Sequence, residues 1–117
     1  MIGVVALMVI AVAEPVTVSA QTPRFTSYDA TVRCAGLTQA ASELEGGESG
    51  EGRLLYDAAL YWSLTAIQVA QASGRAAAAA EADQIRARIR AVRELTAGDA
   101  AAAAELQRCR DRTPRLG

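Results

Sequence analysis

Glycines and a proline divide the chain, from residue 27 onwards, into four stretches in which apolar residues recur three or four positions apart. That spacing places apolar side chains on one face of an α-helix. The predicted helices span about 27–45, 53–73, 75–97 and 100–112, separated by the glycine-rich run 46–52, by Gly74 and by Gly98. The last helix ends before Pro114. We therefore expect an all-α fold, a small bundle of three to four helices.

Each predicted helix has its own apolar stripe. The stripes are Ala30, Cys34, Leu37, Ala41 and Leu44; Leu55, Ala59, Trp62, Ala66 and Val69; Ala78, Ala82, Ile85, Ile89 and Val92; and Ala102, Leu106 and Cys109. The second helix has no charged residue from 58 to 74, and Leu54, Tyr61 and Leu64 broaden its apolar surface. Since such a helix is usually surrounded by others, we expect it to be central in the bundle. A membrane span is the alternative, which Gln68 and Gln71 disfavour.

Two cysteines, Cys34 and Cys109, lie on the apolar faces of the first and last predicted helices. The chain has no histidine and no third cysteine, so it lacks the ligands of a tetrahedral zinc site. Cysteine pairs in exported proteins are typically oxidised. We expect one Cys34–Cys109 disulfide joining the ends of the bundle, with two free thiols as the alternative.

The first twenty residues differ from the rest. Ile2 to Ala13 is an unbroken apolar run, and Val18-Ser19-Ala20 resembles a signal-peptidase site. The run is shorter than the roughly 20 residues that span a bilayer. We expect residues 1–20 to be a signal peptide and residues 21–117 a periplasmic or secreted helical domain without an integral membrane segment. A buried N-terminal helix is the alternative interpretation.

Charge and residue inventory narrow the classes of function. The formal net charge is −1 and all twelve basic residues are arginine, so there is no basic excess for nucleic-acid binding. Without histidine, no Ser-His-Asp or Cys-His arrangement can form. We expect no catalytic residue, no metal and no cofactor. A hydrolase using carboxylates such as Asp57 and Glu81 is a further hypothesis, with no paired geometry to support it.

Two groups of side chains are candidates for partner binding. Tyr56, Tyr61 and Trp62 cluster in the second helix, where aromatic residues either pack in the core or anchor a partner. We expect Trp62 to be buried. Arg86, Arg90 and Arg93 lie in the third helix and could bind anionic groups. Nearby Asp83 and Glu94 favour an ordinary solvated face instead.

Three features of the chain are the single Cys34/Cys109 pair, the segment 55–62 and the Ala-Gly-Asp at 97–99. In these features the chain resembles small exported, alanine-rich helical proteins of no assigned function from GC-rich bacteria. The resemblance implies an exported helical fold and no particular activity. We expect a non-enzymatic protein that acts through protein or envelope contacts, with a protein partner in the cell envelope. A small envelope stress chaperone or enzyme inhibitor is the alternative.

Overall fold

The computed structural model describes Gly3 and residues 27–115, and these residues form four helices and no strand. The helices are α1 (Tyr28–Glu45), α2 (Gly50–Ala72), α3 (Ala77–Thr96) and α4 (Ala100–Asp111). The predicted all-α fold is confirmed. The predicted signal peptide lies, apart from Gly3, outside the described residues.

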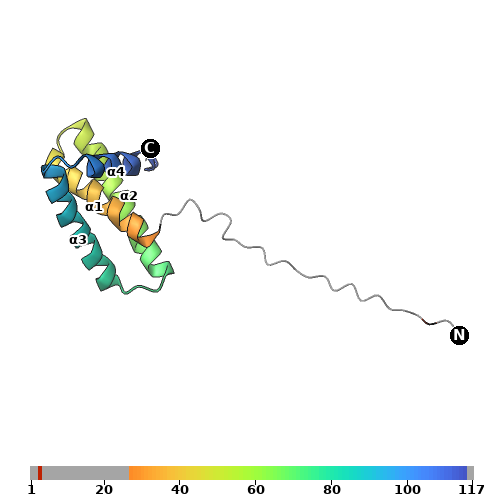
Figure 1. Ribbon diagram of the computed structural model, residues 1–117. Coiled ribbons are helices and arrows are strands. Elements are labelled where there is room, and N and C mark those ends of the chain that lie inside the picture. The colour runs from red at the N-terminus through yellow and green to blue at the C-terminus, as the bar shows by residue number, and fades with distance from the viewer. Residues whose placement is uncertain (1–2, 4–26, 116–117) are drawn as a thin grey trace.

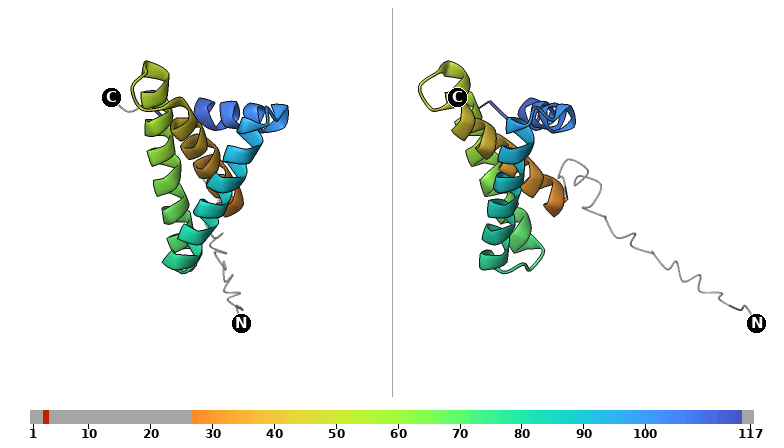
Figure 2. Two further views of the ribbon diagram at one scale, coloured as in Figure 1. Left: turned by 90° about the vertical axis from the view of Figure 1, so that its left-hand side faces the viewer. Right: turned by 60° about the vertical axis from the view of Figure 1, so that its left-hand side comes forward.

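The helices surround α1 rather than forming a regular four-helix bundle. Helices α2 and α3 diverge from their connection like the arms of a V, with α1 between them, and α4 crosses near the open end (Figures 1 and 2). α1 packs extensively against both α2 and α3, whereas α2 and α3 have few contacts with each other. The bundle is therefore built on α1.

The prediction that the second helix is central is wrong, because α1 occupies that place. α1 is buried on several sides by small residues, among them Ala35, Gly36 and Ala40. Thr31 and Thr38 are fully buried, and their hydroxyls donate to backbone carbonyls of the same helix at 2.7 Å. Because these hydroxyls need no outside partner, threonine fits a central helix as well as an apolar residue does.

Trp62 and the disulfide lie together in the main core, as predicted. Cys34 and Cys109 are bonded, with their Cα atoms 5.5 Å apart. The Trp62 side chain is 3% exposed, and its indole N–H donates to the Cys109 carbonyl at 3.2 Å and to Thr113 Oγ1 at 2.9 Å. A buried indole thus has its polar atom satisfied. The bond and the indole together attach α4 to α1 and α2.

The predicted stripe of the third helix is wrong in part, although Val92 packs against the main core as expected. Ala80 and Ala91 are buried, whereas Ala78 is exposed and Ile85 and Ile89 are 46% and 40% exposed. The reason is the closeness of α1 and α3. A Cβ added to Gly36 of α1 would lie 2.5 Å from the Ala87 carbonyl carbon, so only small residues of α3 fit at this contact. Leu44, predicted to face inward from α1, is likewise 53% exposed.

The helix ends follow local chemistry. The side chains of Ser27, Ser49 and Asp99 accept hydrogen bonds from the backbone of the first turns of α1, α2 and α4. α2 therefore begins inside the glycine-rich run, at Gly50, earlier than predicted. Gly74 and Gly98 have φ of 72° and 73° just beyond α2 and α3, the left-handed conformation that glycine adopts most easily.

We expect Gly36→Ala to lower the free energy of unfolding by about 1–2 kcal/mol. Overpacking against Ala87 costs about 1–3 kcal/mol, and the higher helix propensity of alanine offsets up to about 1 kcal/mol of that. Urea denaturation checks the value. Gly47→Ala is the matched control, since no atom lies within 4 Å of a Cβ added there. Equal stability of the two variants would contradict the close α1–α3 contact.

Candidate binding surface

Four large apolar side chains line the solvent side of α2. Tyr56, Leu60, Leu64 and Ile67 are 56%, 43%, 58% and 42% exposed. The opposite side of the same helix packs into the protein through Leu55, Ala59, Trp62, Ala66 and Ala70. Because both sides are apolar and no charged residue interrupts 58–74, α2 presents an apolar row to solvent.

A groove of about 450 Å³ continues this row between α2 and α3. Ile67 lines one wall and Ile85 the other, while Gln39 of α1 contributes to the lining. We call the set Tyr56, Leu60, Leu64, Ile67, Ile85 and Ile89 the α2–α3 surface. A volume of this size lies in the range of small-molecule pockets.

Charged side chains border the groove. Arg88 donates to Glu43 of α1 at 3.1 Å, and the Arg75 guanidinium lies 3.9 Å from the centroid of the Tyr28 ring. Glu81 also lines the groove and is exposed. Among residues 27–115, neither Arg75 nor Glu81 forms an ion pair. The apolar floor of the groove thus has polar edges.

The three predicted aromatic candidates do not form one patch. Tyr61 is half-buried and packs edge-on against Trp62, with ring centroids 5.1 Å apart. Only Tyr56 belongs to the α2–α3 surface. Leu60, Leu64 and Ile67 of that surface are not among the predicted binding residues. The signal for them in the sequence is the uncharged stretch 58–74, which gives α2 a wide apolar surface.

The predicted arginines lie elsewhere on α3, and none of them lines the groove. Arg86 pairs with Asp83 and Arg90 with Glu94, the latter at 3.0 Å. Arg93 is exposed and forms no ion pair within the described part of the chain. Two of the three are therefore part of ordinary pairs on the helix surface.

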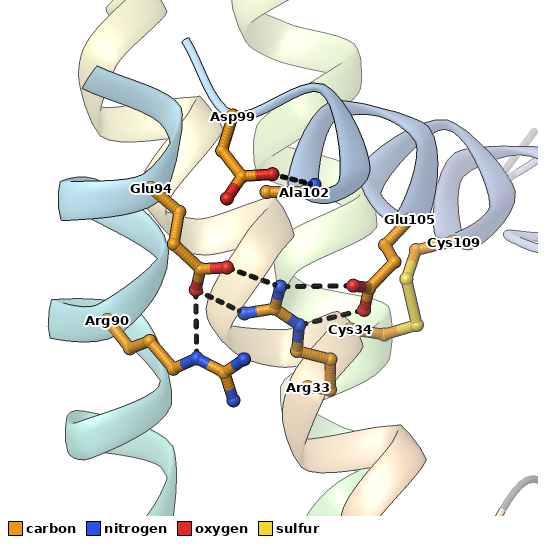
Figure 3. Close-up of polar contacts among 8 residues, drawn as sticks. All are labelled: Arg33, Cys34, Arg90, Glu94, Asp99, Ala102, Glu105 and Cys109. Atoms are coloured by element: carbon orange, nitrogen blue, oxygen red, sulfur yellow. Dashed lines mark hydrogen bonds and ion pairs between the residues drawn. A yellow bond between two sulfur atoms is a disulfide. The ribbon is translucent and has the colours of Figure 1, made fainter. Parts of the chain in front are cut away.

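A polar network that sequence reasoning missed lies beside the disulfide (Figure 3). The Arg33 guanidinium donates to both Glu94 oxygens at 2.8 and 3.0 Å, and to both Glu105 oxygens at 2.9 and 3.3 Å. Arg33 thereby joins α1 to α3 and α4. Its hydrogen bonds hold the pKa of each carboxyl below its usual range, and the two carboxylates raise the pKa of Arg33. Both carboxylates are consequently ionised at neutral pH.

The structure does not bring together the two carboxylates of the hydrolase hypothesis. Glu81 lines the groove between α2 and α3, whereas Asp57 lines a different cavity with Arg110 and Thr113. Within residues 27–115, no three cysteine, histidine or acidic side chains are grouped as metal ligands would be. None of the helices described has the length and apolar character to cross a bilayer.

Comparison with protein-family models, with curated proteins and with solved structures found no match to this chain.

Proposed function

We propose that this chain is a non-enzymatic, exported protein that acts through protein contacts in the cell envelope, and that the α2–α3 surface makes these contacts. The observation that carries the proposal is the row of Tyr56, Leu60, Leu64 and Ile67, each at least two-fifths exposed, on a helix that has no charged residue from position 58 to its end. Contiguous apolar side chains on a protein surface typically mark an interaction site.

Export is supported by two independent features. The apolar run from Ile2 to Ala13, followed by Val18-Ser19-Ala20, has the organisation of a signal peptide. The disulfide between Cys34 and Cys109 suits an oxidising compartment such as the periplasm. A periplasmic or secreted location agrees with both.

A binding role, rather than catalysis, is supported by the state of the reactive groups. The chain has no imidazole, and both thiols are taken up in the disulfide. Glu94 and Glu105 have lowered pKa values, the opposite of what a general acid near neutral pH requires. What the α2–α3 surface offers a partner is apolar side chains with charged side chains at their border.

The test compares two leucine-to-glutamate substitutions in cells that export the protein. Leu64→Glu places a charge in the middle of the α2–α3 surface, whereas Leu44→Glu does the same at a similarly exposed leucine of α1. We expect Leu64→Glu to lower the yield of chemically cross-linked envelope complexes at least tenfold, since losing a central apolar anchor costs about 2 kcal/mol. Leu44→Glu should match the unsubstituted protein. Equal loss, or no loss, in the two variants would contradict the proposal.

A further inference from the structure

We infer that the occupant of the α2–α3 surface is a second copy of this chain, bound with its α2 antiparallel to α2 of the first about a two-fold axis. This inference rests on the proposed function, because it names the partner of the same surface. Three features support it: the spacing of the exposed residues of α2, the absence of charge from residue 58 to the end of that helix, and the opposite charges of Asp57 and Arg75 on either side of this stretch.

The exposed residues of α2 have the spacing of a helix–helix seam. Positions 57, 60, 64, 67 and 71 of α2, followed by Gly74 just beyond its end, alternate steps of three and four, as the a and d positions of a coiled coil do. In an antiparallel pair centred between residues 65 and 66, Leu64 of one copy lies opposite Ile67 of the other. Leu60 then lies opposite Gln71. The two symmetry-equivalent Leu64–Ile67 pairs therefore meet near the axis.

The lack of charge favours a partner related by a two-fold axis. Near such an axis each residue lies close to its own copy, so a charged side chain there would meet a like charge. α2 has no charged residue from Ala58 to the end of the helix. The stretch that would surround the axis is therefore free of like-charge repulsion.

The ends of the seam are complementary in charge. Asp57 precedes the uncharged stretch, and Arg75 follows it. Neither forms an ion pair with any other residue in 27–115. In the antiparallel pair, Asp57 of each copy comes next to Arg75 of the other, which gives two equivalent ion pairs at the borders of the apolar contact. A self-complementary antiparallel partner needs an uncharged stretch with an acid before it and a base after it, and residues 57–75 have this pattern.

The groove gives the second helix a place to pack. Ile67 and Ile85 line its walls, and Leu64 of the second copy would enter beside Ile67. An apolar side chain set into a groove between two helices is the usual form of helix-in-groove recognition. The contact would cover the apolar row that a monomer leaves in water.

Sedimentation equilibrium of the exported, disulfide-bonded protein at physiological salt tests the inference. We expect a dimer for the unsubstituted protein and for Leu44→Glu, and a monomer for Leu64→Glu, which would place two carboxylates at the axis. Asp57→Arg and Arg75→Asp should each weaken the dimer about tenfold, because each brings like charges together at both ends. The double variant restores both pairs in reversed order and should recover most of the lost affinity.

Each other outcome has a definite meaning. A monomer at millimolar concentration, or a dimer that survives Leu64→Glu, would overturn the second copy as occupant. A double charge variant no tighter than the single ones would overturn the antiparallel arrangement. If the protein is monomeric and Leu64→Glu alone still abolishes envelope cross-links, the proposed function stands and the inference fails. The charge variants keep the test valid even if Leu64→Glu reduces stability.

Discussion

Replacing Cys34 and Cys109 together by alanine is expected to lower the free energy of unfolding by about 4 kcal/mol. The disulfide joins residues separated by 75 positions, and closing a loop of that length restricts the unfolded chain by about this amount. Small domains have total stabilities of about 5–15 kcal/mol, so the loss would be a large fraction of the whole. Urea denaturation under non-reducing conditions measures it.

Without the disulfide, the loss of local stability should be greatest in α4. This short helix contacts α1 and α3 much less than α1 contacts its other neighbours, and the disulfide is its covalent link to α1. Amide hydrogen exchange should therefore accelerate more in residues 100–111 than in α1 when the bond is absent. Reduced protein without substitutions is the matched control and should show the same pattern. An unchanged urea midpoint in the double variant would contradict the prediction.

Helix number and helix ends were predictable because their causes are local. Gly74 and Gly98 adopt positive φ just beyond α2 and α3, and Asp99 caps α4 through its own side chain. Each of these effects acts within a few residues of the chain. The glycines predict a turn and a later start for α2, whereas the cap provided by Ser49 sets the helix start at Gly50.

The hydrophobic periodicity of the sequence did not predict which helix lies at the centre. Hydrophobic periodicity shows which side chains are apolar but not how large they are. In this fold the size of the side chains decides which helix lies at the centre. Gly36 of α1 approaches Ala87 so closely that the two helices pack through small side chains, and Ile85 and Ile89 of α3 are left in solvent. The same apolar pattern that predicts a core stripe can therefore produce an exposed surface.

The candidate site was predicted only in part for the same reason. Tyr56 is exposed on the α2–α3 surface, whereas Trp62 is buried and Tyr61 packs against it, because residues 56 and 62 lie on different faces of α2. Arg33 gave no signal in the sequence. Its partners Glu94 and Glu105 lie 61 and 72 positions away, and only the packing of α3 and α4 on α1 brings them together.

Replacing Arg33 by methionine is expected to lower the free energy of unfolding at pH 7 by about 2 kcal/mol. The side chains of Arg33, Glu94 and Glu105 are only 16%, 20% and 35% exposed, so the carboxylates lose a well-placed cation. Removing one partner from a fully buried ion pair costs about 3–5 kcal/mol, and partial solvent screening reduces that figure here. Glu94 keeps its pair with Arg90, whereas Glu105 loses the one ion pair it forms within residues 27–115.

The same substitution should change how stability depends on pH. In the folded protein the pKa values of Glu94 and Glu105 lie below their ordinary value of about 4.3, so the folded state binds fewer protons than the unfolded state in this range. The stabilisation from Arg33 is therefore complete above about pH 4.3 and is lost as the pH falls through the lowered pKa values. Unfolding free energies of the unsubstituted protein and of Arg33→Met should accordingly converge as the pH falls from 7 towards 2. Arg93→Met, at an exposed arginine of α3, should follow the unsubstituted protein at every pH. A constant difference between Arg33→Met and the unsubstituted protein over this range would mean that Arg33 stabilises the fold by packing its aliphatic stem, and not by its charge.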